Sequence, residues 1–390
     1  MSDNIPLGSA VPRRRVDVLV LMDSANVSGP VRQLAAVIRP LKQRDFLLHC
    51  VIFQRRTRPT NPSIDFLRSM GARVSILSDS RAFEPSLLFR LRELIAAAKP
   101  DIVESHGYRP SVLMALLRVT GWVKTAWIGY FHGRTAESLL VKSYDKLDHF
   151  ALRFADLVVV MSDLQRREKR NYSNEVRVLY NAAITETSEA ASDASLNDRL
   201  QFFGKPFVGV IGRLSPEKGV DVALEAWRTV VAEGHAGTLV IAGDGPERGS
   251  YQDYVAAHRL GSRVCFLGHL DGTRHLYPLL GLLVIPSRSE GLPNVFIEAL
   301  RNQLPIVSTR VGAVPELVNE TSAAILVEPN DSRSLAAAIQ QAIDPGSTLV
   351  SQHAAQALVL ATLSLGTRVS KIGQTFTDVL SSSRRGARVA

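Results

Sequence analysis

Two carboxylates, Glu290 and Glu298, flank the predicted start of a helix. An apolar run from Leu282 to Ile285 stops at Pro286, a polar turn follows, and the apolar residues after Asn294 recur at helical spacing. The pattern predicts a buried strand, a loop that carries Glu290, and a helix that carries Glu298 in its second turn. A carboxylate only accepts hydrogen bonds, so each of the two suits a pair of hydroxyl groups.

The helix N-terminus between the carboxylates is expected to attract an anion, because its first N–H groups lack partners and the helix dipole is positive there. A phosphate or diphosphate would lie near Gly291, Leu292, Pro293 and Asn294. Hydroxyl pairs on both sides of a diphosphate are what a sugar nucleotide presents. The plainer interpretation is that Glu298 is an ordinary exposed helix residue and that Glu290 caps the following turn. Spacing alone favours this plainer interpretation.

Positive side chains suited to the same anion follow another predicted strand, Phe207 to Ile211. Arg213 lies at the end of this strand, and Lys218 lies in the first turn of a helix that Ser215 and Pro216 begin. A lysine there opposes the helix dipole at a cost of about 0.3–1 kcal/mol, which a bound diphosphate would reverse. Arginine binds phosphate through two donors and lysine as a point charge.

The first half of the chain alternates predicted strands and helices, which favours a parallel sheet covered on both faces. Gly29 lies in the loop after the first strand, Val16 to Met22, where it would let a ligand approach closely. His106 and His132 each follow a later strand, and ligands of such sheets bind beyond the carboxyl ends of the strands. Each histidine could equally be a loop residue that donates to the main chain.

Four segments in the second half resemble the retaining glycosyltransferases of family 4. They are the stretch that carries Glu290 and Glu298, IGRLSPEKGVDVALEAW (211–227), IAGDGPER (241–248) and STRVGAVPELV (308–318), and they keep the family's order over about 110 residues. The resemblance implies an α/β protein of GT-B architecture, in which two Rossmann-like domains with parallel sheets face each other across a cleft. It also implies transfer of a sugar from a nucleotide-diphosphate sugar with retention of configuration.

The resemblance assigns roles to individual residues of this chain. It places the donor diphosphate on Arg213 and Lys218, the ribose on Glu298 and the transferred sugar on Glu290, with His132 beside the reacting sugar. The remaining assignments are Gly29 and residues 291–294 on the donor and, on the acceptor side, His106 and Arg134. Relatives often carry two adjacent glycines where this chain has Gly29 alone, so its role is less firmly implied.

Length and composition agree with two soluble domains. A chain of 390 residues exceeds the ~250–300 at which one core stops growing. We predict an acceptor-binding domain over 1–183, a linker over 184–200, a donor-binding domain over 201–363, a helix over 364–380 that completes the first domain, and a disordered tail over 381–390. Two cysteines give no disulfide framework, and no metal-ligand spacing occurs, so neither a metal nor another cofactor is expected.

Charge is concentrated in the first half, where residues 1–183 hold 28 Lys and Arg against 17 Asp and Glu. This bias favours an anionic partner, either an anionic membrane surface or a phosphorylated acceptor, or simply a solvated basic surface. The basic clusters lack interleaved aromatic residues, which disfavours nucleic acid. Without a signal peptide or an apolar span, the sequence predicts a cytoplasmic protein, peripheral on the cytoplasmic membrane face.

The sequence therefore predicts a metal-independent hexosyltransferase that acts on a lipid-linked saccharide in glycan or exopolysaccharide synthesis. A transferase with a small soluble or phosphorylated acceptor is one alternative. A sugar-nucleotide epimerase of the same architecture is another, and a degenerate, membrane-bound binding subunit is a third. The matched residues Arg213, Lys218, Glu290 and Glu298 disfavour the degenerate form.

Overall fold

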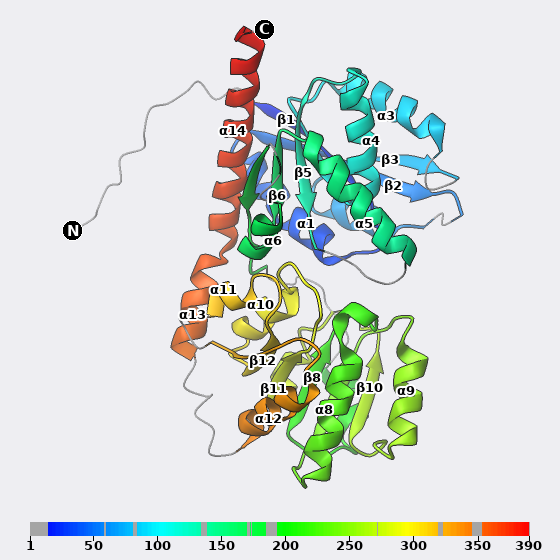
Figure 1. The fold of residues 1–390 in the computed structure, drawn as a ribbon, viewed down its shortest axis with the longest axis vertical. Coiled ribbons are helices and arrows are strands. Elements are labelled where there is room, and N and C mark those ends of the chain that lie inside the picture. The colour runs from blue at the N-terminus through cyan, green and yellow to red at the C-terminus, as the bar shows by residue number, and fades with distance from the viewer. Residues whose placement is uncertain are drawn as a thin grey trace, which may run out of the picture.

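The computed structural model describes residues 15–57, 60–80, 84–133, 139–169, 172, 174–184, 193–270, 272–318, 323–344 and 353–389. Two parallel sheets lie one above the other along the long axis of the molecule, and each is covered by helices (Figure 1). The described strands of the first sheet come from the first half of the chain, and those of the second sheet come from the second half.

The first sheet has the strand order β3-β2-β1-β4-β5-β6-β7 among the described residues, and all neighbours pair in parallel. Its central strands are apolar runs with both faces buried, as expected for a sheet covered on two sides. The strands are β1 (Val16–Met22), β2 (Phe46–Arg55), β3 (Arg73–Asp79), β4 (Ile102–His106), β5 (Ala126–Phe131), β6 (Leu157–Val160) and β7 (Glu175–Val178).

Helices cover the two faces of this sheet in separate groups. One face packs against α1 (Gly29–Lys42), α2 (Pro62–Ser69) and the C-terminal helix α14 (Leu365–Val389). The other face packs against α3 (Pro85–Ala98), α4 (Tyr108–Val119), α5 (Leu139–Ala151) and the short 3-10 helix η1 (Leu152–Phe154). The short helix α6 (Asp163–Glu168) begins shortly after β6 ends, and Ser162 caps its first turn.

The second sheet has the order β10-β9-β8-β11-β12-β13 among the described residues. Its strands are β8 (Phe207–Ile211), β9 (Thr238–Ala242), β10 (Val264–Gly268), β11 (Leu282–Ile285), β12 (Ile306–Thr309) and β13 (Ile325–Val327). Helices α8 (Val220–Ala232), α9 (Arg248–Ala257) and α12 (Ser332–Ile343) cover one face. The other face carries α7 (Asp193–Leu200), α10 (Asn294–Arg301), α11 (Val314–Val318) and α13 (His353–Thr362).

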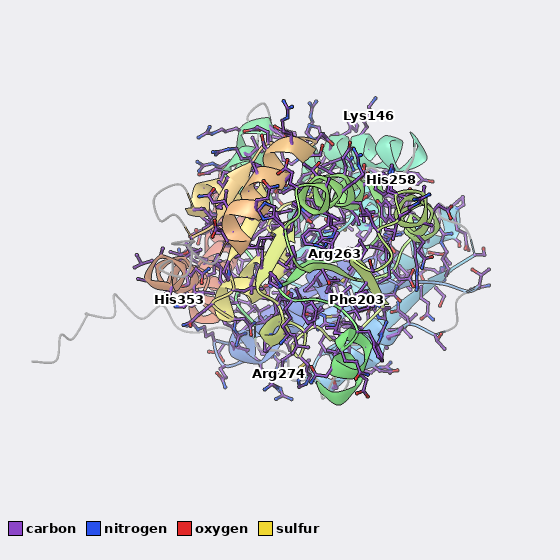
Figure 2. All side chains as sticks on the ribbon, turned by 90° about the horizontal axis from the view of Figure 1, so that it is seen from below. Lys146, Phe203, His258, Arg263, Arg274 and His353 are labelled. Atoms are coloured by element: carbon purple, nitrogen blue, oxygen red, sulfur yellow. The ribbon has the colours of Figure 1, made fainter. Side chains whose placement is uncertain are left out.

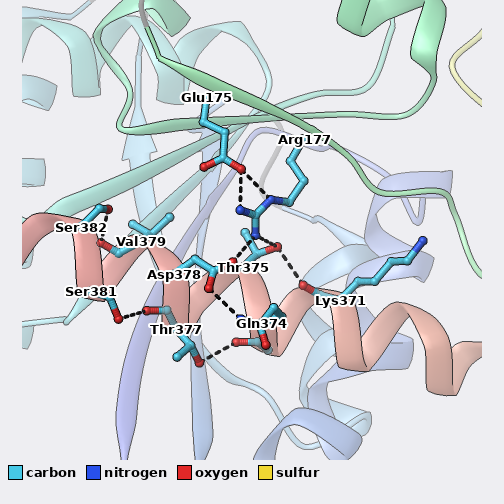
Figure 3. A network of polar contacts seen from close by, with 11 residues as sticks. Glu175, Arg177, Lys371, Gln374, Thr375, Thr377, Asp378, Val379, Ser381 and Ser382 are labelled. Atoms are coloured by element: carbon cyan, nitrogen blue, oxygen red, sulfur yellow. Dashed lines mark hydrogen bonds and ion pairs between the residues drawn. The ribbon is translucent and has the colours of Figure 1, made fainter.

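The C-terminal helix α14 returns to the first sheet, where Val369, Ile372, Phe376 and Val379 join the core formed with α1. Polar contacts add to this packing, because the guanidinium of Arg177 on β7 donates to residues of α14 (Figure 3). The structure differs from the predicted disordered tail (381–390), since the helix continues to Val389. No proline interrupts this segment, so the helix propagates at little cost.

The chain passes between the two sheets at two neighbouring points. The main-chain N–H of Ala183 donates to the carbonyl of Leu363 at 2.7 Å, so the outgoing and returning segments touch. Part of the predicted linker (184–200) forms α7, because Leu196 and Leu200 are one helical turn apart and both are buried in the core of the second domain. The remaining domain boundaries stay predictions.

Candidate active site

The N-termini of two helices from different domains face each other between the sheets. Gly29 is the first residue of α1, and Asn294 is the first residue of α10. A Cβ atom on Gly29 would lie 2.4 Å from the side-chain nitrogen of Asn294, so glycine lets the two helix starts approach closely. An anion beside this contact would meet N–H groups of the first turns of both helices.

The side chain of Asn294 is held from the first domain. Its Oδ1 accepts hydrogen bonds from Gln33 Nε2 and Asn181 Nδ2, each at 3.3 Å. Gln33 is itself fixed, because it exchanges two hydrogen bonds of 2.9 and 2.8 Å with the main chain of Ala182. The start of α10 is therefore connected to α1 and to the segment where the chain leaves the first domain. Sequence reasoning missed Gln33 and Asn181, since their role depends on contacts across the domains.

Glu290 and Lys218 form an ion pair beside these helix ends, in which Lys218 Nζ donates to Glu290 Oε1. Ser287 Oγ donates to the same carboxylate oxygen at 3.2 Å. The sequence predicted Lys218 in the first turn of a long helix, but it ends the 3-10 helix η2 (Pro216–Lys218) and α8 begins two residues later. Gly219 separates the two helices because it adopts a left-handed conformation, with φ of +65°.

Glu298 accepts hydrogen bonds from two residues that the sequence did not single out. The hydroxyl of Tyr277, in the 3-10 helix η3 (Tyr277–Leu279), donates to Glu298 Oε2 at 2.6 Å. Thr273 Oγ1 donates to the same oxygen at 3.2 Å. Tyr277 belongs to an apolar stretch and is buried, so its residue type gave no signal of a polar role. These two contacts restrict how the Glu298 carboxylate can turn.

The two histidines meet at the carboxyl ends of neighbouring strands. His106 is the last residue of β4 and His132 directly follows β5, and their ring atoms Nδ1 and Nε2 are 2.9 Å apart. The Nε2 of His106 lies 3.6 Å from Glu104 Oε2, and the ring of Tyr130 stacks on His106 with centroids 4.2 Å apart. The sequence predicted each histidine at the end of a strand. Because β4 and β5 are neighbours in the sheet, the two histidines lie side by side.

The surroundings keep His132 neutral. Burial lowers the pKa of His132 well below 6.5, and the neighbouring His106 and the Arg368 guanidinium from α14 lower it further. Since the Glu104 carboxylate faces Nε2 of His106, we infer a proton on that nitrogen. His106 Nδ1 then accepts from Nε2–H of His132, and Nδ1 of His132 is left as a hydrogen-bond acceptor.

The Glu290 loop and the end of β5 are in direct contact across the domains. A Cβ atom on Gly291 would lie 2.7 Å from the main-chain carbonyl oxygen of His132, so this contact requires glycine. A second contact lies nearby, where the Glu316 carboxylate on α11 accepts from the main-chain N–H of Asp163 at 2.9 and 3.1 Å. The structure thus places the loop of Glu290 against the strand end that carries His132.

The structure gives fewer contacts for the other predicted site residues. Arg213 follows β8 and is exposed. Leu292 and Pro293 are buried, with Leu292 in the core of the second domain, so a ligand would meet their main chain. Arg134 lies outside the described residues. Among the described residues, no group of three or more His, Cys, Asp or Glu side chains is placed to hold a metal ion.

A cavity of about 300 Å³ opens in the first domain near the main chain of His106. Asp23, which lines it, donates its main-chain N–H to the carbonyl of His106 at 3.3 Å. Buried Arg109 forms ion pairs with Asp79 and, at 3.3 Å, with Asp23, whose pKa is raised by burial. The lining residues are Asp23, Ala25, Phe53, Gln54, Arg55, Thr60, Asn61, Tyr108 and Arg109.

A larger cavity of about 490 Å³ lies at the opposite edge of the same sheet. Residues at the amino ends of three strands line it, among them Asp17, His49 and Arg73. Ligands of open α/β sheets bind at the carboxyl ends of the strands, so we assign the chemistry to the edge that carries the histidines.

Two family models match the chain, one described as "Glycosyltransferase Family 4" over residues 27–187 and one as "Glycosyl transferases group 1" over residues 205–344. The chain belongs to glycosyltransferase family 4. The predicted family and enzyme class are confirmed: this glycosyltransferase uses a nucleotide-sugar donor.

Two relatives indicate how varied the matching enzymes are. An alpha-D-kanosaminyltransferase of Streptomyces kanamyceticus is 28% identical over 294 residues, which cover 71% of this chain and 69% of that protein. The O-antigen biosynthesis glycosyltransferase WclY of Escherichia coli is 27% identical over 236 residues, which cover 56% of this chain and 64% of WclY.

The predicted GT-B fold is also confirmed. The crystal structure of Anabaena Alr3699/HepE in complex with UDP and glucose superimposes with a TM-score of 0.76 and 20% identity. The match covers 93% of this glycosyltransferase and 99% of the Anabaena chain. No described helix is long and apolar enough to cross a membrane.

Proposed function

We propose that this glycosyltransferase moves a sugar, with retention of configuration, from a nucleotide-diphosphate sugar to a hydroxyl group of a lipid-linked saccharide. The observation that carries the proposal is the Lys218–Glu290 pair, which lies beside two facing helix N-termini and next to the strand end of His132. A positive lysine, a carboxylate that can accept hydrogen bonds from hydroxyl groups, and a neutral imidazole therefore lie close together. The Anabaena structure of the same fold is a complex with UDP and glucose, which supports a nucleotide-sugar donor.

In the proposed reaction the diphosphate lies at the starts of α1 and α10, beside their contact, with Lys218 and Arg213 against its charge. Glu298, oriented by Tyr277, accepts from the ribose hydroxyls, and Glu290 accepts from hydroxyls of the transferred sugar. The main-chain N–H groups at the two helix starts are fixed before the leaving group develops its charge, so they stabilise the transition state without reorganising.

Retention follows if the acceptor attacks from the face that the diphosphate leaves. The bond between the anomeric carbon and the diphosphate oxygen breaks, and the acceptor oxygen bonds to the same face of that carbon. The acceptor proton passes to the leaving diphosphate, so no protein nucleophile is needed. Nδ1 of His132 accepts a hydrogen bond from a sugar hydroxyl and so orients the reacting ring.

We assign the acceptor to the 300 Å³ cavity beside His106. Its volume is at the lower end of the range for small-molecule sites, and its lining of Asp23, Arg55, Asn61 and Arg109 suits a hydroxylated ring better than a lipid chain. The lipid part of a lipid-linked acceptor would then stay outside. The same polar lining keeps a small soluble acceptor as the second candidate.

The basic first domain supports a site of action at an anionic membrane surface on the cytoplasmic side. Two basic clusters in the sequence suggest where contact would occur, one with Arg55, Arg56 and Arg58 and one with Arg166, Arg167, Lys169 and Arg170. The structure lowers the charge that the second cluster exposes. Lys169 is buried, with its Nζ 3.0 Å from His149 Nδ1 and 3.7 Å from the ring centre of Phe131. Arg166 pairs with Asp163 at 2.8 Å. This cluster therefore offers less charge to a membrane than the sequence predicted.

A panel of sugar nucleotides tests the proposed function. Purified protein is incubated with UDP-, GDP-, ADP- and dTDP-sugars, alone and with lipid-linked saccharides or phosphorylated sugars. Release of nucleoside diphosphate that depends on a lipid-linked saccharide supports the proposal. Release that depends on a soluble acceptor favours the second candidate, and a new sugar isomer without release would identify an epimerase.

A further inference from the structure

The outer surface of the α3–α4–α5 layer exposes an unusual number of large apolar side chains. Eleven such side chains are exposed among the described residues, and seven of them come from this layer. We call these seven the apolar patch: Phe89, Leu116, Val119, Trp122, Leu147, Phe150 and Phe154. Scattered single exposures need no explanation, but a concentration of this kind marks an interaction surface.

The side chains of the apolar patch lie on neighbouring elements. On α4 and the turn after it, Leu116, Val119 and Trp122 follow at three-residue spacing and so share one helix face. The ring of Phe89 on α3 lies 5.4 Å from that of Trp122. Helix α4 packs against α3, α5 and η1 and lies between α3 and α5 (Figure 1).

The second stripe of the apolar patch runs along α5 and η1. Phe150 and Phe154 stack edge to face with ring centres 5.5 Å apart, and Leu147 lies one helical turn before Phe150. An ion pair connects the elements that carry the two stripes. Arg118 Nη2 of α4 lies 2.6 Å from Oδ1 of Asp156, just beyond η1. The patch therefore spans three adjacent helices.

Positive charges surround the apolar patch. The Arg92 guanidinium lies over the Trp122 ring at 5.0 Å, and Lys124, Lys146 and Arg153 are exposed nearby. Figure 2 shows Lys146 at the outer edge of the molecule. Among the described side chains of α3, α4, α5 and η1, Glu93 is the one exposed acid. The surface therefore combines tryptophan and phenylalanine with exposed cations.

We propose that the apolar patch docks this protein on the surface of an anionic bilayer. Tryptophan and phenylalanine insert at the level of the lipid head groups, and lysine and arginine beside them attract anionic lipids. Lysine is depleted at interfaces between proteins, so Lys124 and Lys146 disfavour a second copy of the chain as the occupant. The inference rests on the proposed lipid-linked acceptor for its purpose, but it is tested without any substrate.

Trp122 provides an optical reporter. It is 40% exposed, whereas Trp127 and Trp227, the two other tryptophans, are fully buried. Vesicles of phosphatidylcholine and phosphatidylglycerol should shift the fluorescence to shorter wavelength and protect it from acrylamide, and pure phosphatidylcholine should not. Trp122→Phe should abolish the shift while vesicle flotation persists. A shift that persists in this variant would come from the buried tryptophans and would overturn the placement.

A charged variant of the apolar patch and a matched control complete the test. Val119→Asp with Phe150→Asp should weaken partitioning onto phosphatidylglycerol vesicles by at least about tenfold. Phe202→Asp changes an 86% exposed aromatic residue of the second domain and should leave partitioning unchanged. Nucleotide binding of all three proteins should match, since the substitutions lie outside the proposed site.

Equal partitioning of the patch variant and the wild type would overturn the proposal, as would equal binding to neutral vesicles. A wild-type dimer that becomes monomeric in the patch variant, with no vesicle binding, would assign the surface to self-association instead. Vesicle binding in a protein that proves to have no transferase activity would keep this inference and remove the proposed function, so the two can fail separately.

Discussion

Lys218→Ala should weaken the binding of a nucleoside diphosphate by about 10- to 150-fold. The variant removes a hydrogen bond from a charged donor, which contributes about 1.5–3 kcal/mol, and each 1.4 kcal/mol corresponds to a factor of ten. Lys218 Nζ has three donors and gives one to Glu290, so two remain for phosphate oxygens and the ion pair need not break.

The loss should lie in the upper part of this range. The side chain of Glu290 is only 14% exposed, and without Lys218 its charge would face the diphosphate uncompensated. The double variant Lys218→Ala/Glu290→Gln removes that repulsion and should therefore bind better than Lys218→Ala alone. This non-additivity measures how strongly the two residues are coupled.

Titration calorimetry measures the effect, with the nucleotide that gives the largest thermal shift in a panel of UDP, GDP, ADP and dTDP. Arg228→Ala is the matched control, because it removes one positive charge from a 3.7 Å ion pair with Glu225 on α8 in the same domain. Its affinity should equal that of the wild type. A folded Lys218→Ala variant with wild-type affinity would refute the assignment of the diphosphate site.

Further predictions concern the carboxylates, the histidines and metal. Glu298→Gln should mainly raise the KM for the donor, and Glu290→Gln should mainly lower kcat; parallel effects on both constants would remove the distinction. Excess chelator should leave the initial rate unchanged, since helix N-termini and basic side chains can neutralise the diphosphate, and rescue of a lost rate by magnesium would contradict this. The acid limb of the rate profile should lie below pH 6.5, because the pKa of His132 is lowered, and Arg368→Gln should move it upward. Glu104→Gln should invert the imidazole tautomers of His106 and His132, which nitrogen NMR of labelled histidine detects, and unchanged tautomers would refute the inferred proton positions.

The central strands could be predicted from the sequence, because each is an apolar run that ends at a turn. The predicted bounds of β1, β8 and β11 equal those in the structure. The local arrangement around Glu290 and Glu298 could also be predicted, since the loop and helix that carry them are contiguous in sequence.

Contacts made only in the folded chain could not be predicted. Strand β7 is short and carries charged residues, so it lacks the apolar run that marks its neighbours. The bond from Tyr277 to Glu298 joins residues from separate elements, and nothing in either residue type indicates the other. Lys169 sits among basic residues in sequence, yet it is buried against aromatic rings, a state that depends on helix α5.

The hydrogen bond between Ala183 and Leu363 has a consequence for how such enzymes diversify. Because the chain leaves and re-enters the first domain at one point, the second domain is an insertion whose two ends meet. A segment with adjoining ends is readily exchanged as a block without disturbing the host. We expect that residues 184–363 could be replaced by the corresponding segment of a relative without disturbing the packing of the first sheet.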